Sequence, residues 1–497
     1  MLDSPTITMS MDGTPKNITN QLGAALYHQI QQAGQCSILR FWDQLTQSEQ
    51  ESFARQLAKI DWDFVKTARP RDVVTNRIDP QKRQSVRPVR CCVPADGHSE
   101  AELVVPRGAG QQLLAGGKVA VILVAGGQAT RLGVSHPKGT FPIGPVSGAS
   151  FYQRFAEQVV ALNRRYQTSI PYLVMTSDST HDASVEWFAN HNNFGLNPDD
   201  LHFFRQGSAP AFHLDSGELI MSSRSSLALN PDGHGGLLQA MKRAGLFERL
   251  KERGIETLFY HQVDNPLVKV CDPVFLGQHA IQGADISTRV IRKHSPEEKV
   301  GVIAEVDGLC QIIEYSDLPA ELAELRDDRG QLTFWAGNTA IHLFQRQFLE
   351  EVSESEQLPW HHLVRPCPYV DLEGGLIQPT WKNAVKFERF IFDILPLAKV
   401  SLVVEADRDH EFSPLKNAEG SNSPDQVKAD LIRVAAALLR ESGIDVAPGT
   451  PVEVSPLVTT SDLPLIPLET CPSSVNEPTL FDDRYLAPPP IFVAPNL

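Results

Sequence analysis

The segment VAVILVAGGQATRLGVSHPKG, Val119 to Gly139, holds the residues whose types and spacing best suit phosphate chemistry. An apolar run leads into the paired glycines Gly126 and Gly127, and Arg131 and Lys138 follow closely. Glycines after a strand let backbone N–H groups approach phosphate oxygens, and nearby cations neutralise phosphate charge. The segment therefore predicts an anion-binding loop. The alternative is a tight turn whose two cations are merely solvated.

Two common phosphate-binding motifs are absent from the sequence. There is no GxxxxGK[ST] pattern and no GxGxxG pattern, which disfavours a nucleotide-dependent kinase or ligase and a dinucleotide-binding protein. The glycine-rich segment RGAGQQLLAGG, residues 107–117, precedes the apolar run instead of following it. It does not suit a phosphate-binding turn.

The elements that must position this loop are those of an α/β sheet. Short apolar runs alternate with amphipathic or polar stretches between Lys118 and about Val404. The runs are VAVILV, SIPYLVMTS, ETLFYHQVD and DISTRVIR. This alternation predicts an α/β domain with a mostly parallel central sheet. Ligands of such sheets bind beyond the carboxyl ends of the strands, where Gly126 and Asp264 are expected.

The regions on either side of this domain have different patterns. From about Asn17 to Thr67 the pattern is helical, with apolar residues at Ile38, Phe41, Trp42 and Leu45, and Ser48 with Glu51 resembles the capping box of a second helix. Residues 69–117, rich in Pro, Arg and Gly, are expected to form a loop-rich connector. After about Gly420 the chain becomes Pro-rich, so helices are not expected to continue. We expect a helical N-terminal region with connector (1–117), a main domain (118–404) and a small C-terminal domain with a Pro-rich tail (405–497).

Composition limits the classes of function. With 45 basic and 60 acidic side chains the net charge is −15, which argues against a general nucleic-acid binder. The scattered cysteines do not suggest a disulfide scaffold, and the adjacent pair lacks zinc-ligand spacing; they are Cys36, Cys91, Cys92, Cys271, Cys310, Cys367 and Cys471. The N-terminus has no signal-peptide pattern, and no stretch is as apolar as a membrane span. We expect a cytoplasmic monomer or weak homo-oligomer without nucleic-acid or membrane partners.

The phosphate-type loop also carries a resemblance to a known family. LVAGGQATRLGVSHPKG resembles the signature of the UTP-dependent sugar-1-phosphate uridylyltransferases, above all the eukaryote-type UDP-N-acetylhexosamine pyrophosphorylases. Similar segments follow in the family's order: FFRQG, NPDGHGGL, VDNPLVKVCDPVF, IIEYSD, WAGNTAIHLF, KFERFIFDI and EFSPLKNAEG. With LRFWDQL near the start, the resemblance covers about Leu39 to Gly420. It implies a glycosyltransferase-A-like, Rossmann-type nucleotidyltransferase core with smaller flanking domains.

The resemblance implies a reaction between UTP and a sugar-1-phosphate, most simply N-acetylglucosamine-1-phosphate. A sugar phosphate oxygen attacks the α-phosphorus of UTP, giving a UDP-sugar and pyrophosphate. Such phosphoryl transfer needs alignment and charge neutralisation more than it needs a base. The matching catalytic residues are Arg131, Lys138 and Lys416, and Asp264 matches the ligand of Mg²⁺. Taken alone, Asp264 before Asn-Pro suits a turn, and Lys416 suits a solvated loop.

Substrate-binding residues are implied in the same way. Those matching nucleotide-binding positions are Gly126, Gly127, Gln206, Gly233 and His234. Those matching sugar-phosphate positions are Glu314, Asn338, Lys386, Phe390 and Phe392. Without the resemblance, the two phenylalanines would be alternate core residues of one strand face, and Lys386 a surface lysine.

Two positions depart from the family's pattern. The family usually has Gly where this chain has Ala129, and a methyl group there would be strained if the position required a positive φ. His234 stands where the acetylhexosamine enzymes more often have Asn, while a histidine is familiar in the glucose-using relatives. Two alternatives therefore remain: a UTP–glucose-1-phosphate or broad-specificity UDP-sugar pyrophosphorylase, and a non-catalytic nucleotide-sugar sensor.

Overall fold

The chain divides into two compact units, which are described separately. The computed structural model describes residues 18, 21–68, 82–90, 92–95, 98–355, 358–461 and 463–494. The smaller unit comprises residues 1–76, 207–235 and 359–390, and the larger unit comprises 77–206, 236–358 and 391–497. The smaller unit thus gathers three separate stretches of chain. The sequence instead predicts domain boundaries after residues 117 and 404. These boundaries stay a prediction.

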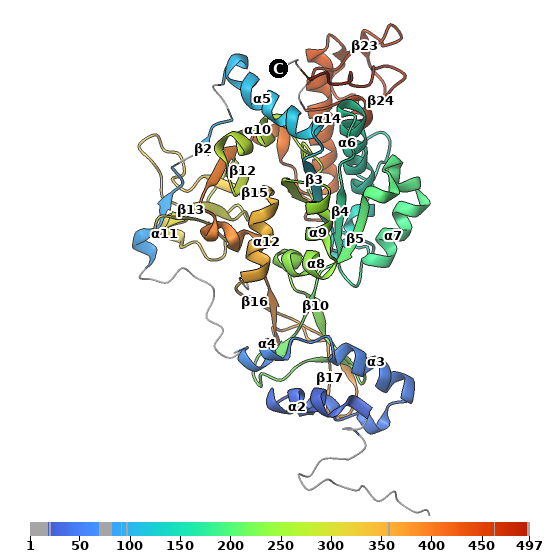
Figure 1. The fold of residues 1–497 in the computed structure, drawn as a ribbon, viewed down its shortest axis with the longest axis vertical. Coiled ribbons are helices and arrows are strands. Elements are labelled where there is room, and N and C mark those ends of the chain that lie inside the picture. The colour runs from blue at the N-terminus through green and yellow to red at the C-terminus, as the bar shows by residue number, and fades with distance from the viewer. Residues whose placement is uncertain are drawn as a thin grey trace, which may run out of the picture. The chain divides into compact units, whose positions relative to one another are not determined.

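A mostly parallel central sheet forms the framework of the larger unit (Figure 1). Its main path has the order β2-β20-β12-β15-β11-β3-β4-β5. These strands are β2 (Cys92–Val93), β20 (Ser401–Glu405), β12 (Ile286–Arg292), β15 (Ala336–Gln345), β11 (Thr257–Gln262), β3 (Val119–Val124), β4 (Tyr172–Thr176) and β5 (Leu201–Arg205). Neighbours are parallel except at β15, which is antiparallel to both β11 and β12. The predicted α/β class is confirmed, and the four predicted strands correspond to β3, β4, β11 and β12.

The strand order of this sheet predicts where a ligand binds. From β3 the chain winds outward through α6 (Phe151–Tyr166), β4, α7 (His181–Asn190) and β5. It returns through α8 (Leu237–Arg243) and α9 (Leu246–Glu252) to β11, on the other side of β3. The strand order therefore reverses between β3 and β11, and ligands of open α/β sheets bind at such a switch point.

A hairpin extends the central sheet beside β15, and a 3₁₀ segment packs on this hairpin. The strands β13 (Val302–Val306) and β14 (Leu309–Ile313) are joined by Asp307-Gly308, whose φ angles of 52° and 81° suit a two-residue hairpin turn. The 3₁₀ segment η10 (Ile391–Leu397) packs on β14. Other elements of this unit are β1 (Arg87–Pro88), which pairs with β13, α11 (Ala320–Ala323), and α12 (Arg346–Ser355), which packs on α8 and β15.

The expected connector is wrong over residues 100–115, which form the helix α5 (Glu100–Ala115). Ser99 and Glu102 make a capping box at its start. The helix packs on α10 (Pro273–Gln282), where a Cβ on Gly110 would lie 1.8 Å from the carbonyl oxygen of Pro273 (Figure 1). Gly110, one of the glycines that favoured a loop, therefore serves a close contact between two helix backbones, which local sequence does not reveal.

The expectation that helices end after Gly420 is also wrong. Residues Pro424–Glu441 form the long helix α14, with Ser423 as its N-cap and Pro424 at its first position, where proline is tolerated. Its apolar face packs with short segments that follow it into a C-terminal core. Those segments are β21 (Asp445–Val446), β22 (Val452–Val454), η11 (Pro456–Val458), β23 (Ser474–Val475) and β24 (Thr479–Phe481).

The smaller unit has its own core, in which Trp42, Phe53 and Phe212 are buried. Its helices are α2 (Ala24–Gln32), α3 (Gln47–Leu57) and α4 (Trp62–Thr67). Its strand pairs and sheet are formed by β6 (Ser208–Pro210) with β10 (Leu229–Pro231), β8 (Met221–Ser223) with β9 (Ser226–Leu227), β17 (Tyr369–Val370) with β18 (Leu376–Ile377), and β16 (His361–Arg365), β19 (Ala384–Glu388) and β7 (Phe212–His213).

Two details of the helical prediction for this unit are wrong. The apolar spacing over residues 38–45 belongs to two 3₁₀ turns, Cys36–Leu39 and Trp42–Gln44, and not to an α-helix. The capping box is formed by Thr46 and Glu49, because the carboxylate of Glu49 reaches back to the N–H of Thr46. The described ranges contain no helix both long and apolar enough to cross a bilayer. Residues 1–17, where the sequence lacks a signal pattern, and Cys91 lie outside the described residues.

Candidate active site

The loop after β3 is closed by hydrogen bonds within itself. The N–H of Ala129 donates to the carbonyl of His136 (3.1 Å), and the N–H of Lys138 donates to the carbonyl of Gly127 (3.1 Å). Two short 3₁₀ turns, Thr130–Leu132 and Lys138–Thr140, complete it. Local hydrogen bonding therefore fixes where the loop presents its basic residues.

The two paired glycines face different surroundings. A Cβ on Gly126 would lie 2.3 Å from Oε1 of Gln206, whereas a Cβ on Gly127 would meet nothing within 4 Å. Gln206 is 7% exposed, and its N–H donates to the carbonyl of Thr176 (2.8 Å). The predicted nucleotide residues Gly126 and Gln206 thus pack together, while the backbone at Gly127 borders open space.

Ala129 is accommodated in this loop without backbone strain. Its φ and ψ are −87° and 31°, which any residue with a Cβ adopts, and its side chain is buried. The position therefore does not require the glycine that is usual in the resembling family.

The charged residues expected from three separate segments come together beside the loop. Nζ of Lys138 donates to the carbonyl of Leu415, which directly precedes Lys416. Burial lowers the pKa of Lys138; Asp264 opposes this effect, and Lys416 and Arg131 reinforce it. Lys138 therefore lies near two other cations, which repel it unless an anion joins them. The arrangement suits a polyphosphate.

Backbone and amide hydrogen bonds align the segments that carry Asp264 and Lys416. The N–H of Leu415 donates to the carbonyl of Asp264 (2.8 Å). The side-chain amide of Asn265 donates to the carbonyl of Glu411 (2.7 Å) and accepts from the N–H of Ser413 (3.0 Å). Residues 264–265 and 411–415 are therefore held side by side. No sequence pattern indicated this role for Asn265.

The donor set suits a divalent cation shared with a substrate. Asp264 is half-buried at the end of β11, where Gln262 pairs in register with Val124 of β3. Within the part of the chain that the structure describes, there is no group of three or more His, Cys, Asp and Glu side chains able to hold a metal ion. Mg²⁺ often binds through one or two carboxylates plus substrate phosphates, so Asp264 fits that ion without further protein ligands.

Two of the residues expected on the sugar side meet at Gly301. Oε1 of Glu314 lies 3.0 Å from the position that a Cβ on Gly301 would take, and the N–H of Asn338 donates to the carbonyl of Gly301 (2.8 Å). Oδ1 of Asn338 accepts from the N–H of Ala340 (3.0 Å). Phe392, on η10, is only 5% exposed, which favours the core alternative for that ring.

The other expected residues lie in the smaller unit. Gly233 has a φ of 83°, and a Cβ there would lie 2.4 Å from the carbonyl oxygen of Arg389. The ring of His234 stacks on Phe390, with centroids 5.2 Å apart, and His361 stacks on the same ring at 4.4 Å. Burial and the nearby His361 lower the pKa of His234 to about 4, so this ring is neutral near pH 7.

Lys386 lies on β19 near Glu388. Burial raises the pKa of Glu388, and Lys386 is the main group that opposes this effect. The guanidinium of Arg389 lies over the ring of Trp360, 3.8 Å from its centroid. The sequence prediction did not single out Arg389 or His361, and no spacing in the sequence distinguishes them.

Comparison with known proteins gives consistent matches over most of the chain. Residues 57–477 match the family model described as UTP–glucose-1-phosphate uridylyltransferase. The UDP-N-acetylhexosamine pyrophosphorylase-like protein 1 of Xenopus tropicalis is 37% identical over 409 residues, covering 78% of this chain and 79% of that protein. The UDP-N-acetylglucosamine pyrophosphorylase of Saccharomyces cerevisiae is 35% identical over 452 residues, covering 85% and 92%.

A solved structure shows the same fold at lower identity. The uridine diphosphate N-acetylglucosamine pyrophosphorylase of Trypanosoma brucei, in complex with an inhibitor, superposes with a TM-score of 0.73 at 22% identity. It covers 92% of this chain and 94% of its own.

Proposed function

This chain belongs to the UTP–glucose-1-phosphate uridylyltransferase family of nucleotidyltransferases, and we propose that it makes UDP-N-acetylglucosamine from UTP and N-acetylglucosamine-1-phosphate with Mg²⁺. Enzymes of this family take UTP and a sugar-1-phosphate and generally depend on a divalent metal ion. The names of the similar yeast and Xenopus proteins support the acetylated sugar. We further infer a cytoplasmic location from the sequence.

The observation that carries this proposal is the position of Lys138, whose ammonium group binds the carbonyl of Leu415 and lies near Asp264, Arg131 and Lys416. Uridylyl transfer moves negative charge between the attacking sugar phosphate, the α-phosphate and the leaving pyrophosphate. Preorganised cations stabilise that charge without reorganising during the reaction. In our proposal Lys138 neutralises the α-phosphate, and Arg131 and Lys416 bind the outer phosphates. A metal ion held by Asp264 would add further charge neutralisation.

The nucleobase and the sugar are assigned to other residues of the chain. Gln206 presents an amide, which both donates and accepts, beside Gly126 and suits the polar edge of uracil. In the smaller unit, Gly233 and His234 are proposed as nucleotide-binding residues, with His234 acting as a neutral ring. Glu314 accepts from sugar hydroxyls and Asn338 pairs with a hydroxyl or the acetamide. Their common neighbour Gly301 supports this pairing.

The proposed sugar is tested by pyrophosphate release from UTP and Mg²⁺ across four substrates. These are the 1-phosphates of N-acetylglucosamine, N-acetylgalactosamine, glucose and galactose. We expect kcat/KM to be highest for N-acetylglucosamine-1-phosphate. A preference for glucose or galactose would instead support the alternative to which His234 points, a UTP–glucose-1-phosphate or broad-specificity enzyme.

Replacing Gly127 by alanine tests whether the nucleotide approaches this backbone. Nothing in the protein lies within 4 Å of the new methyl group, so the thermal unfolding midpoint should not change. A methyl group facing a closely bound ligand costs about 1–3 kcal/mol. We therefore expect the KM for UTP to rise about tenfold or more.

The matched control is Gly108→Ala in α5, where a Cβ also meets nothing within 4 Å. This variant should keep the wild-type KM. An unchanged KM in Gly127→Ala would show that the nucleotide does not lie against Gly127.

A further inference from the structure

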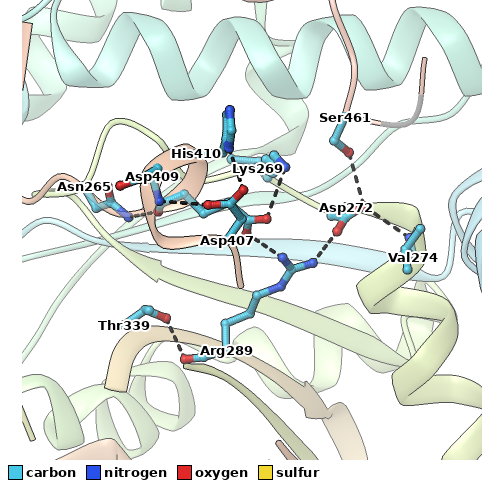
Figure 2. Close-up of polar contacts among 12 residues, drawn as sticks. Asn265, Lys269, Asp272, Val274, Arg289, Thr339, Asp407, Asp409, His410 and Ser461 are labelled. Atoms are coloured by element: carbon cyan, nitrogen blue, oxygen red, sulfur yellow. Dashed lines mark hydrogen bonds and ion pairs between the residues drawn. The ribbon is translucent and has the colours of Figure 1, made fainter. Parts of the chain in front are cut away.

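A buried guanidinium, that of Arg289, is linked through Glu411 and Asn265 to the segment that carries Asp264. Arg289, on β12, is 6% exposed and forms ion pairs with two carboxylates, those of Glu411 and Asp272. Figure 2 shows the pair with Asp272. Glu411, the last residue of α13 (Arg408–Glu411), also accepts from Nζ of Lys269 at 3.1 Å. Burial alone would raise the pKa of Glu411, but Arg289 and Lys269 hold it below its usual value. Glu411 is therefore ionised at neutral pH.

Stability alone does not account well for such a network. Taking charges out of water costs several kcal/mol per ion, and apolar replacements of whole buried ion pairs are often as stable or more so. A buried ion pair does, however, fix the positions of both partners, because displacing either leaves an uncompensated charge. These charges therefore hold in place the segments to which Arg289 and Glu411 are bonded.

Glu411 is hydrogen-bonded to the segments that carry Asp264 and Lys416. The carbonyl of Glu411 accepts from the side-chain amide of Asn265 (2.7 Å), the residue after Asp264. The same amide accepts from the N–H of Ser413, and Leu415 donates to the carbonyl of Asp264. Fixing Glu411 therefore fixes the alignment of the two segments that carry Asp264 and Lys416.

The backbone of Arg289 is hydrogen-bonded to the strand that carries Asn338, one of the proposed sugar-binding residues. Its carbonyl accepts from Oγ1 of Thr339 (2.7 Å), and Thr339 follows Asn338 on β15 (Figure 2). The pairing of β12 with β15 shifts register between Arg289 and Val290. Arg289 thus connects to the phosphate side through its side chain and to the sugar side through its backbone.

We propose that Arg289 and Glu411 are positioning residues for the transfer reaction. Their ion pair sets the place of Asp264, and so of the divalent metal ion, relative to Lys416 and Lys138. This inference rests on the proposed function. It adds that a metal ligand and a phosphate-binding lysine are aligned by a charge pair that does not itself touch the substrate.

Asp272 provides a matched control, because its other hydrogen bonds are not made with the segments that carry Asp264 and Lys416. Asp272 is the N-cap of α10, where its carboxylate accepts from the N–H of Val274 (3.2 Å), and it also accepts from Oγ of Ser461 (3.4 Å) (Figure 2). Asparagine caps a helix about as well as aspartate. Asp272→Asn and Glu411→Gln therefore each remove one negative charge from the same guanidinium and nearly conserve shape.

The experiment compares these two variants in the full-length protein with UTP, N-acetylglucosamine-1-phosphate and varied Mg²⁺. We expect both to lower the thermal unfolding midpoint. Only Glu411→Gln should lower kcat and raise the Mg²⁺ concentration for half-maximal rate, each by about 10- to 100-fold, as is typical for residues that orient metal ligands. Asp272→Asn should stay within about twofold of wild type in both kinetic values.

Equal kinetic losses in both variants, or none in Glu411→Gln, would overturn the proposal. If Glu411→Gln does not accumulate as folded protein, Asn265→Ala replaces it, since it cuts the same link while leaving the ion network intact. It should show the same rise in Mg²⁺ requirement, and wild-type Mg²⁺ dependence would overturn the proposal. Wild-type protein without transferase turnover would instead contradict the proposed function.

Discussion

Alanine at Lys138 is expected to lower kcat for uridylyl transfer by about 10²- to 10³-fold, the loss typical when one positioned donor is removed from a developing anion. Lys138 is half-buried beside Asp264, Arg131 and Lys416. Its hydrogen bond to the carbonyl of Leu415 and that of its N–H to Gly127 hold the ammonium group in a fixed position. Its charge is therefore not replaced by a mobile neighbour. Single-turnover pyrophosphate release measures the rate of the transfer step, and calorimetry measures UTP binding separately.

The matched control is Lys118→Ala. Lys118 directly precedes β3, at the end opposite to Gly126, and forms a surface ion pair with Glu256 at 2.9 Å. Such pairs contribute little to stability, and no substrate is assigned to that edge. The control should keep wild-type kcat. If Lys138→Ala turned over as fast as Lys118→Ala, the positioned ammonium group would have no role in the transfer step.

Replacing Asp264 by asparagine is expected to abolish most of the acceleration by Mg²⁺. Asparagine keeps the size of the side chain but removes the charge that a hard divalent cation prefers. A metal ion supplies several kcal/mol of charge stabilisation in the transition state, so kcat at saturating UTP should fall about 100-fold or more. Steady-state rates over a Mg²⁺ titration measure the effect.

Glu256→Gln is the control for this substitution, because Glu256 precedes β11 at the end opposite to Asp264. It should show wild-type Mg²⁺ dependence. Retention of that dependence in Asp264→Asn would assign the metal ion to other ligands and leave Asp264 as a turn residue.

The sequence predicted the parts of the site that are encoded locally. An apolar strand that ends in glycines identifies the phosphate side of a parallel sheet, and the loop between Gly126 and Lys138 is closed by its own hydrogen bonds. Asp264 and Lys416 were predicted as site residues because they lie in the segments VDNPLVKVCDPVF and EFSPLKNAEG, which resemble those of the family.

Features that depend on packing between distant segments could not be predicted in this way. The segment of α5 was predicted as a connector because the contact that explains Gly110 is made with α10, far along the chain. The capping box was predicted at Ser48, two residues after its observed position at Thr46, because two overlapping patterns fit the same stretch. Arg289 lies 17 residues from Asp272 and 122 from Glu411, so no local spacing could reveal their network.

The central claim, that this chain catalyses uridylyl transfer, is tested most directly by product analysis. Wild-type protein is incubated with UTP, N-acetylglucosamine-1-phosphate and Mg²⁺, and UDP-N-acetylglucosamine and pyrophosphate are quantified together. We predict equal amounts of both products, and neither product when one substrate or the metal ion is omitted. UTP binding without either product, for this sugar and for the other three, would contradict catalysis and leave a nucleotide-sugar sensor.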